Sequence, residues 1–380
     1  MRTPTDRMMR VRTSRRLRST APFVTAAFVA ATLLIAAALA GCGSGGGTSG
    51  SGATPMPPMS AGTIVGAGAT FPQPLYSKWG QDYAGASGVK LNYQGIGSGG
   101  GISAIEAKTV DFGASDAPLT QADLDANGLV QFPMVIGGVV MVVNVPGISA
   151  GGITLDAATL AGIYSGSITV WNDPAIVALN SGVTLPSTAI NVVHRSDSSG
   201  TTWIFTNYLT QAVPDAWTAG ADKEIPWPTG VGAKGSSGVA ATVQQVVGSI
   251  GYVDQAYAFQ NGMAYTKLVN HDGKVVEPSV QTITSAAVNA PWAEAADNGF
   301  YALLVDAPGA NSWPITGASF ILMQKAPADA ARSKAAIDFF SWAFKQGGTS
   351  ATDLTYVPIP AAVQALVVKK AWSQITGAGQ

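Results

Sequence analysis

Short apolar runs alternate with helical patterns along the chain from residue 63 onward. Runs rich in β-branched residues and bounded by glycine or proline predict strands, whereas apolar positions spaced three and four apart predict helices. Strands are expected at 89–93, 110–114, 134–144, 190–194, 250–253 and 319–323. Helices are expected at 74–83, 102–108, 201–209, 239–247 and 331–344. This strand and helix alternation favours an α/β architecture with mainly parallel sheets.

Two apolar β-runs interrupted by proline and glycine, at 132–140 and 311–317, have the character of crossings between lobes. A body of about 320 residues favours two lobes over one sheet. If both runs are hinge strands, one lobe comprises residues 62–138 plus 312–380 and the other comprises residues 139–311.

The N-terminal residues have the pattern of an export signal. Residues 1–41 carry seven arginines and one acidic residue, and the apolar run 23–40 is followed by the sequence Leu-Ala-Gly-Cys. A basic segment, an apolar segment and small residues before a cleavage point are the parts of such a signal. Leu-Ala-Gly-Cys resembles the bacterial lipobox, so we expect cleavage before a lipidated Cys42. The alternative is an uncut transmembrane helix, because eighteen residues reach the lower limit for a span.

Residues 42–61 contain no charge and are rich in glycine, serine and proline. They are expected to form a flexible tether with a reach of about 25 Å. The sequence therefore predicts an exported body held at the outer face of a bacterial membrane, or on its periplasmic side. The Arg15-Arg16 pair is followed by residues that match the twin-arginine pattern poorly, and the choice between that export route and the general secretory route stays open.

Composition removes several classes of function. The chain has 380 residues, one cysteine and two histidines, so neither an intrachain disulfide nor a Cys/His zinc cluster can be built. Residues 42–380 hold 14 basic and 21 acidic residues, a net charge of -7. Generic binding of nucleic acid or anionic membrane needs a basic face, and we expect neither.

One type of loop occurs three times, each time at the start of a predicted helix. The three loops, at 66–72, 95–101 and 194–202, combine glycine with serine or threonine. Free N–H groups and the positive end of the helix dipole make such a position an anion site, although any single loop could be an ordinary helix cap. The recurrence favours anion binding.

Arg195 and Arg332 are the two arginines of residues 42–380. Arg332 lies in an amphipathic stretch and is expected on a solvated helix face. Arg195 lies in the third loop, where its planar fork could hold two oxygens of a tetrahedral anion and Asp197 could hold the fork in place. A purely structural Arg195–Asp197 pair is the alternative.

Asp116 follows a predicted strand and precedes Pro118. A carboxylate beside an anion site repels the anion unless it accepts a hydrogen bond from it. Phosphate at neutral pH has a proton to donate, whereas sulfate does not. The alternative is an aspartate that caps a turn.

Six stretches of residues 63–372 together resemble, in order and spacing, the periplasmic phosphate-binding proteins of bacterial ABC phosphate importers. They are GAGATFPQPLYSKW, NYQGIGSGGG, VDFGASDAPL, FPMVIGGVV, RSDSSGT and GSIGYVDQAYA. The resemblance implies the two-lobed periplasmic-binding-protein fold, closing like a Venus flytrap on one dehydrated phosphate without metal or cofactor. It also implies a monomer that delivers phosphate to the permease subunits of an importer.

Carried over residue by residue, the resemblance implies nine phosphate-binding positions. They are Thr70, Phe71, Ser98, Asp116, Arg195, Asp197, Ser199, Gly200 and Thr201. Gly99 stands where relatives often have serine, and His194 stands where another base is common, but neither difference removes an expected ligand.

Three other functions compete with this interpretation. Gly95-x-Gly97-x-x-Gly100 satisfies the spacing of a dinucleotide-binding loop, with Asp116 about twenty residues further on. A phosphoester hydrolase would need a base beside a nucleophilic serine, whereas His194 is expected to point away from Arg195. A binding protein for another tetrahedral oxyanion, such as sulfate, is the third. We expect a binding protein and not an enzyme.

Overall fold

The computed structural model describes residues 62–288 and 290–377. The predicted export signal, the tether and Cys42 lie outside these residues and stay predictions. Within the described residues, no helix is both long and apolar enough to cross a membrane.

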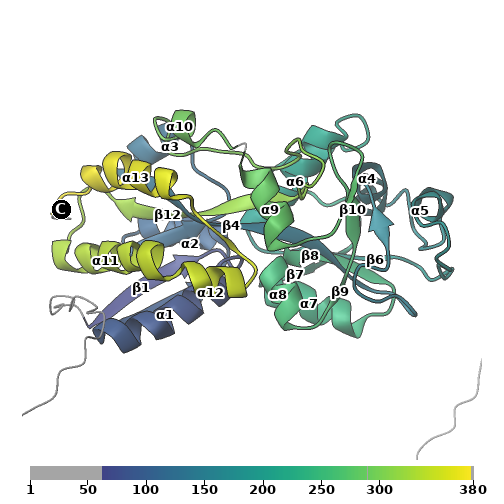
Figure 1. Cartoon of the computed structure of the whole chain (residues 1–380), viewed down its shortest axis with the longest axis horizontal. Coiled ribbons are helices and arrows are strands. Elements are labelled where there is room, and N and C mark those ends of the chain that lie inside the picture. Colours follow the sequence, from purple (N-terminus) through teal and green to yellow (C-terminus); the bar gives the residue numbers. More distant parts are fainter. Residues whose placement is uncertain (1–61, 289, 378–380) are drawn as a thin grey trace, which may run out of the picture. The chain divides into compact units, whose positions relative to one another are not determined.

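A ten-stranded mixed sheet organises the described chain (Figure 1). Its hydrogen-bonded order is β2-β1-β3-β12-β4-β8-β6-β7, and β9 and β13 also pair with β4. The strands are β1 (Thr63–Gly68), β2 (Lys90–Gly95), β3 (Phe112–Ser115), β4 (Leu129–Asn144), β6 (Asn191–Arg195), β7 (Val231–Ala233), β8 (Ser249–Asp254), β9 (Ala264–Tyr265), β12 (Thr316–Gln324) and β13 (Val357–Pro358). A second sheet has the order β11-β10-β5, formed by β11 (Val275–Val276), β10 (Lys267–Val269) and β5 (Thr154–Leu155).

The long strand β4 is shared by two groups of strands. Its residues 129–138 pair with β12, and its residues 139–144 pair with β8. Fifteen of its sixteen residues are buried, which explains the continuous apolar run in the sequence. The register against β12 shifts opposite Pro133, where the missing N–H cannot join the ladder. The single strand β4 therefore belongs both to the group of strands that includes β12 and to the group that includes β8.

The expectation of mainly parallel sheets is wrong. The units β1-α1-β2-α2-β3 and β6-α6-β7-α7-β8 do give the parallel pairs expected of strand and helix alternation. However, β12 pairs antiparallel with β3 and β4, and β4 pairs antiparallel with β8, β9 and β13. The two long strands run past each other in opposite directions, and that pairing depends on contacts remote in sequence.

Helices cover the sheet, and the expected ones are all present. They are α1 (Gln73–Ser87), α2 (Ser98–Glu106), α3 (Gln121–Ala126), α4 (Ala157–Ser165), α5 (Pro174–Leu179), α6 (Gly200–Ala212), α7 (Gly235–Gln245), α8 (Gln255–Gln260), α9 (Val280–Ala287), α10 (Trp292–Ala295), α11 (Ala330–Gln346), α12 (Gly348–Asp353), α13 (Ala361–Lys370) and the 3₁₀ turn Trp372–Gln374. Figure 1 places α1, α11, α12 and α13 around one group of strands, and α4, α5, α7 and α8 around the other.

Two helices begin earlier than their apolar patterns indicate. Helix α2 starts at Ser98 and α7 starts at Gly235, four residues before each expected start. Their first turns consist of glycine and serine, which carry no apolar signal. Both of these first turns belong to the site described below.

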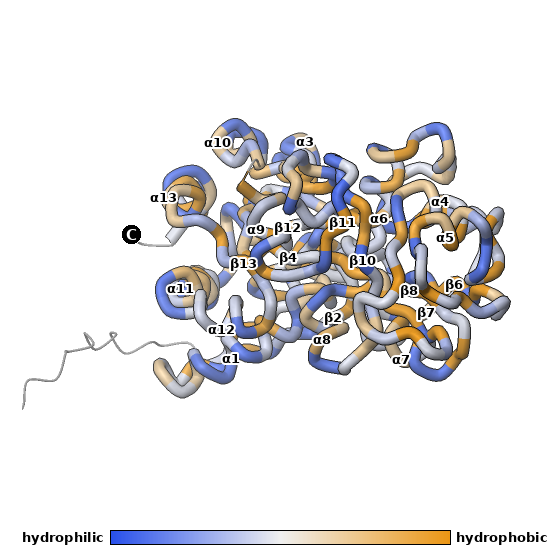
Figure 2. The backbone as a smooth tube through the Cα atoms, turned by 45° about the vertical axis from the view of Figure 1, so that its right-hand side comes forward, coloured by the Kyte–Doolittle hydropathy of each residue, from blue (hydrophilic) through white to orange (hydrophobic). Residues whose placement is uncertain are grey.

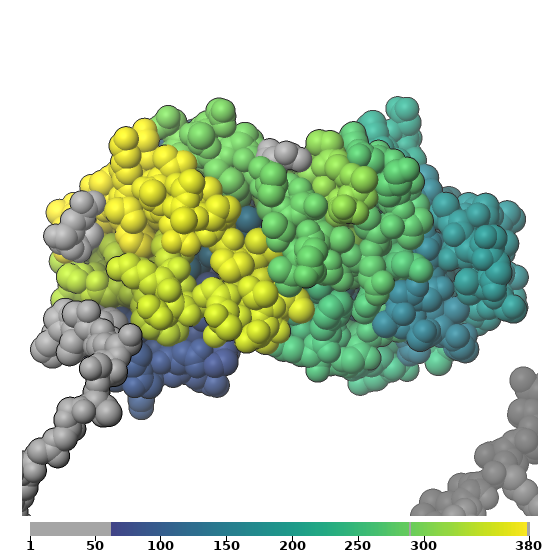
Figure 3. Space-filling view, viewed as in Figure 1, coloured from purple at the N-terminus to yellow at the C-terminus, as the bar shows by residue number. Residues whose placement is uncertain are grey.

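One hydrophobic cluster extends through both groups of strands by way of β4. In Figure 2 the hydrophobic residues concentrate on interior strands and the hydrophilic residues on outer turns. Gly137 and Gly138 let large rings pack on the backbone of β4, because a Cβ at these positions would stand 2.7 Å from Phe71 and 3.1 Å from Trp313. Figure 3 shows the C-terminal segment, in yellow, in contact with the green segment that includes α9. The limits predicted for the two lobes stay a prediction.

Candidate functional site

The first predicted loop places Thr70 and Phe71 between β1 and α1. Thr70 is 8% exposed, and Phe71 is fully buried. The hydroxyl of Tyr356 donates a hydrogen bond of 2.6 Å to the carbonyl oxygen of Phe71. Gly68 permits the turn before them, with φ +145° and its Cα against the backbone of Ala114.

Ser98 joins three segments that are distant in sequence. It is the first residue of α2 and is fully buried. Its Oγ accepts hydrogen bonds from the backbone N–H of Asp116 at 3.1 Å and from the backbone N–H of Gly200 at 3.0 Å. The second loop, the end of β3 and the third loop therefore meet at this hydroxyl.

Arg195 ends β6 and is 4% exposed. Its Nε donates to Oδ1 of Asp197 at 2.7 Å and its Nη2 donates to Oδ2 at 2.5 Å, so the lateral pair expected from the sequence is present. Nη1 has one longer contact, 3.4 Å to the hydroxyl of Thr201. The guanidinium of Arg195 and the backbone N–H of Gly235 hold the pKa of Asp197 below its usual range, against the effect of burial, so Asp197 is ionised.

Ser199, Gly200 and Thr201 form the start of α6. Ser199 is the N-cap, and its Oγ accepts from the N–H of Thr202 at 3.2 Å. A Cβ on Gly200 would stand 2.5 Å from Oγ of Ser98 and 2.6 Å from Cβ of Asp116. Only glycine fits here, because the third loop packs directly on Ser98 and Asp116.

Asp116 is 1% exposed, and among the described residues neither of its carboxyl oxygens has a hydrogen-bond partner. Burial raises its pKa to about 7; the nearby Ser319 hydroxyl and Arg195 guanidinium oppose the rise, and Asp254 adds to it. The Ser319 hydroxyl lies near but also lacks a partner of good geometry. Two unpartnered buried acceptor oxygens in a native fold call for an explanation, and a ligand that donates a proton supplies one.

The structure thus gathers all nine predicted site residues around the starts of α1, α2 and α6 and the end of β3. Backbone N–H groups at helix starts and the Arg195 guanidinium supply positive potential. Within residues 62–288 and 290–377, no cluster of three or more His, Cys, Asp or Glu side chains could hold a metal ion. The assembled groups suit a small anion held by directed hydrogen bonds.

The sequence interpretation missed a fourth glycine and serine loop, at the start of α7. The N–H of Gly235 donates to Oδ1 of Asp197 at 2.9 Å. Oγ of Ser236 lies 3.2 Å from Oγ1 of Thr70. Gly235-Ser236-Ser237-Gly238 combines glycine with serine before a helix, as the other three loops combine glycine with serine or threonine, and that signal could have found it.

A cavity of about 510 Å³ adjoins the site. Thr70, Asp197 and Ser236 line it on the side of the site, and Lys234 and Tyr257 line it further out. Lys234 is exposed and brings positive charge to this cavity.

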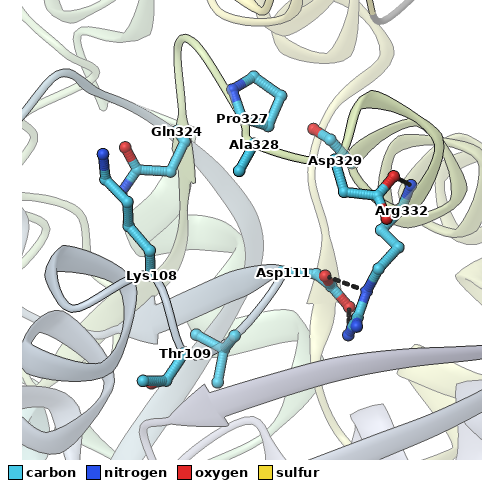
Figure 4. A pocket seen from close by; sticks show the side chains of 10 residues that line it. Lys108, Thr109, Asp111, Gln324, Pro327, Ala328, Asp329 and Arg332 are labelled. Atoms are coloured by element: carbon cyan, nitrogen blue, oxygen red, sulfur yellow. Dashed lines mark hydrogen bonds and ion pairs between the residues drawn. The ribbon is translucent and has the colours of Figure 1, made fainter.

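Arg332 has no part in this constellation. It lies on the exposed side of α11, as expected, and forms a two-pronged ion pair with Asp111 at 2.9 and 3.0 Å (Figure 4). The pair lines a separate cavity of about 200 Å³. The sequence did not predict this partner for Arg332.

The dinucleotide interpretation fails on the structure of the second loop. The N–H of Gly99 donates to the carbonyl oxygen of Ser198 at 3.0 Å, and the Ser198 side chain fills the space beside Gly99. A Cβ on Gly97 would stand 2.5 Å from the carboxylate of Asp197. The protein's own third loop therefore occupies the place a pyrophosphate would need.

Neither histidine is arranged as a catalytic base. His194 stacks on Trp227 with ring centroids 4.9 Å apart, and its Nδ1 lies 3.0 Å from the carbonyl oxygen of Arg195. Nδ1 of His271 lies 3.2 Å from Asp306. In the part of the chain that the structure describes, neither ring has a hydrogen bond to a serine hydroxyl.

Comparison with known proteins identifies close relatives. A family model described as a PBP superfamily domain matches residues 53–346. A phosphate-binding protein PstS of Xylella fastidiosa is 52% identical over 299 residues, covering 78% of this chain and 81% of that protein. The protein of the same name from Haemophilus influenzae is 49% identical over 319 residues, covering 83% and 94%.

Solved structures share the fold. A high-affinity periplasmic phosphate-binding protein with bound phosphate has a TM-score of 0.66 at 24% identity, covering 84% of this chain and 99% of that one. A phosphate-binding protein from Stenotrophomonas maltophilia has a TM-score of 0.62 at 21% identity, covering 84% and 100%. These likenesses confirm the expected two-lobed α/β fold.

Proposed function

Because this chain belongs to the PstS family of phosphate-binding proteins within the PBP superfamily, we propose that it binds inorganic phosphate outside the cytoplasm and delivers it to an ABC importer. One observation supports the proposal above all others. The Arg195–Asp197 ion pair, the Ser98 hydroxyl and the unpartnered carboxyl of Asp116 lie together in a buried site. These groups supply N–H and O–H donors for anion oxygens and one acceptor for a phosphate proton.

Arg195 contributes the N–H groups of its guanidinium that do not pair with Asp197. A guanidinium has five N–H donors, and Asp197 takes one from Nε and one from Nη2. One N–H of Nη2 and one N–H of Nη1 are then available to the anion at the end of the guanidinium, while Nη1 also has its 3.4 Å contact with the Thr201 hydroxyl. The ion pair fixes this orientation before the anion binds, so little side-chain entropy is lost on binding.

Asp116 supplies the acceptor. Its pKa of about 7 is close to the second pKa of phosphate, so near neutral pH one proton is available to be shared between the carboxyl and a phosphate oxygen. Fully ionised sulfate brings no proton and meets an ionised Asp116 as a like charge. We propose that this contrast is the origin of selectivity for phosphate.

The two groups of strands correspond to the two lobes in this proposal, with residues 62–138 plus 312–380 in one and 139–311 in the other. The change of partner of β4 from β12 to β8 between residues 138 and 139 supports the first limit. Motion at the hinge strands would separate Ser98 from Gly200 and admit phosphate, and closure would return both to contact.

For residues outside the described ranges, we propose an export signal at 1–41, a lipid anchor on Cys42 and a tether to residue 61. The Leu-Ala-Gly-Cys sequence supports this. The partners in this proposal are the permease subunits of an importer, and the binding protein acts as a monomer.

Calorimetry with inorganic phosphate, sulfate, molybdate and a phosphate monoester tests the proposed function. Tight binding of phosphate alone, with the monoester neither bound nor cleaved, is the expected result. Equal affinity for sulfate would favour a general oxyanion-binding protein, and turnover of the monoester would favour a hydrolase. Either result would overturn the proposal.

A further inference from the structure

The stretch GSIGYVDQAYA is one of the six that resemble the phosphate-binding proteins, yet none of the nine phosphate-binding positions lies in it. Its Tyr252 lies on β8 and is fully buried. The phenolic oxygen of Tyr252 accepts a hydrogen bond from the backbone N–H of Arg195 at 3.1 Å and lies 2.7 Å from the hydroxyl oxygen of Thr202. One phenol therefore contacts both the end of β6 and the start of α6.

The backbone N–H of Arg195 needs this partner because β6 and β8 pair only at their beginnings. The ladder between the two strands joins Asn191 and Val192 to β8. On the other side of β6, the N–H of the next residue, Ser196, donates to the carbonyl oxygen of Ala233 beside it at 3.0 Å. Successive N–H groups of a strand point to opposite sides, so the N–H of Arg195 points toward β8. The phenol there takes the place of a backbone carbonyl.

The two hydrogen bonds of the phenol do not compete with each other. A backbone N–H can only donate, so the phenolic oxygen accepts from Arg195 and its own hydrogen stays free. The bond to Thr202 then forms whichever of the two hydroxyl groups donates. Tyr252 is fully buried and Thr202 is 1% exposed, so water does not replace either contact. The phenol therefore holds the end of β6 and the start of α6 at a fixed separation.

Stacking fixes the ring that carries this hydroxyl. The ring of Tyr252 stacks on Phe205, with centroids 4.9 Å apart and an interplanar angle of 29°. Phe205 lies on α6, three residues after Thr202. Trp227 packs against the same ring at 5.9 Å. The ring of Tyr252 is thus attached to α6 both by its hydroxyl and by its face, and it reaches Arg195 from there.

The proposed phosphate site depends on this separation. The guanidinium of Arg195 and the N–H groups at the start of α6 have to reach oxygens of the same anion. The ion pair with Asp197 orients the guanidinium within the third loop, but it does not tie the end of β6 to α6. The direct contact of the guanidinium with Thr201, on α6, is long at 3.4 Å. Tyr252 supplies the shorter connection.

We propose that Tyr252 is a positioning residue for phosphate binding: its hydroxyl fixes the backbone of Arg195 against the start of α6, so that the guanidinium and the helix N–H groups converge on one anion. The proposal rests on the proposed phosphate site. Without the hydroxyl, the backbone N–H of Arg195 and the Thr202 hydroxyl lose a buried partner, and the end of β6 can move relative to α6.

The test measures phosphate affinity by calorimetry for the full-length protein and its Tyr252→Phe variant, which keeps the ring and removes the hydroxyl. Tyr164→Phe is the matched control. Tyr164 is also fully buried and packs against Phe205 at 4.8 Å, but its hydroxyl has no hydrogen-bond partner among the described residues. We expect Tyr252→Phe to lose about tenfold in affinity and Tyr164→Phe to stay within about twofold of the wild type.

A second measurement separates positioning of Arg195 from a general loss of packing. In an Arg195→Ala background there is no guanidinium to position, so we expect Tyr252→Phe to lower the affinity by only about twofold more. A general loss of packing would lower it by the same factor in both backgrounds. Thr202→Val breaks the contact from the other side and is expected to weaken binding by about threefold or more, whereas Thr202→Ser keeps the hydroxyl and should recover most of that loss.

Equal affinities of Tyr252→Phe and Tyr164→Phe, or an equal loss from Tyr252→Phe with and without Arg195, would overturn the proposal and leave the phosphate site intact. If Tyr252→Phe does not fold, the comparison of Thr202→Val with Thr202→Ser decides the matter, and equal affinities of these two would overturn the proposal. Failure of the wild type to bind phosphate would instead overturn the proposed function.

Discussion

The hydroxyl oxygen of Ser98 accepts a hydrogen bond from the backbone N–H of Gly200 at 3.0 Å, although 102 positions separate the two residues. Ser98 begins the helix that precedes β3 in the chain, and Gly200 begins the helix that follows β6. The same hydroxyl accepts from the N–H of Asp116. The Ser98 side chain therefore fixes the distance between the two segments that enclose the anion site. Its hydrogen bond to Gly200 forms only when these two segments are in contact.

A methyl group at Gly200 should prevent that contact. Gly200→Ala would place Cβ 2.5 Å from Oγ of Ser98 and 2.6 Å from Cβ of Asp116, so the two walls would have to move apart. We expect phosphate affinity to fall by at least tenfold in calorimetry. Gly85→Ala is the matched control, because no atom lies within 4 Å of its Cβ, and it is expected to bind normally. Undiminished binding by Gly200→Ala would contradict the closed geometry.

Arg195 should carry a large share of the affinity. Arg195→Ala leaves anion oxygens and the buried Asp197 without their partner, which we expect to cost about 2–5 kcal/mol, or roughly 30- to 4,000-fold. Arg195→Lys should not restore full affinity, because an ammonium cannot pair with Asp197 and the anion in the same plane. Titration with phosphate checks both. A greater loss of phosphate affinity in Arg332→Ala than in Arg195→Ala would show that the phosphate site has been assigned to the wrong residues.

Asp116 should set the preference for phosphate over sulfate. An ionised carboxylate can pair with a P–OH group but repels sulfate, whereas an asparagine amide can turn its N–H₂ toward either anion. We expect Asp116→Asn to weaken discrimination far more than it weakens phosphate binding. Paired titrations of the wild type and variant at pH 8 measure the ratio. An unchanged ratio of phosphate affinity to sulfate affinity would rule out a role of Asp116 in recognising the phosphate proton.

The two buried acids should make the stability of the ligand-free protein depend on pH. Asp116 and Asp254 have a pKa of about 7 in the folded protein against 3.8 as the ordinary value. Between these values the folded state holds protons that the unfolded chain has released, so the contribution of both acids to stability falls as pH rises through this window. We expect the Tm of Asp116→Asn/Asp254→Asn to rise relative to the wild type between pH 5 and pH 8. A constant Tm difference would contradict the raised pKa values.

Cys42 should determine where the protein resides. Cys42→Ser removes the thiol that would be lipidated, so we expect a soluble protein that still binds phosphate and leaves the detergent phase in a partition assay. The wild type should enter that phase. Retention of the variant in the membrane would instead favour an uncut apolar segment at 23–40 as the anchor.

The chemistry of the site was largely readable from the sequence. Glycine with serine or threonine before a helix can be recognised from the sequence as a candidate anion-binding turn, because the free N–H groups and the helix dipole are local properties of the backbone. Arg195 stood out because Arg332 is its only counterpart in residues 42–380. The apolar runs likewise predicted the strands and helices, since burial of one face imposes its period on the sequence.

What the sequence could not supply was the pairing between distant segments and its consequences. Three contacts join residues that are more than 100 positions apart in the sequence. They are the antiparallel pairing of β12 with β4, the hydrogen bond between Ser98 and Gly200, and the contact between the hydroxyl groups of Ser236 and Thr70. Local propensity carries no information on such pairs. The raised pKa values of Asp116 and Asp254 follow from burial, and only the tertiary structure decides which carboxyls water cannot reach.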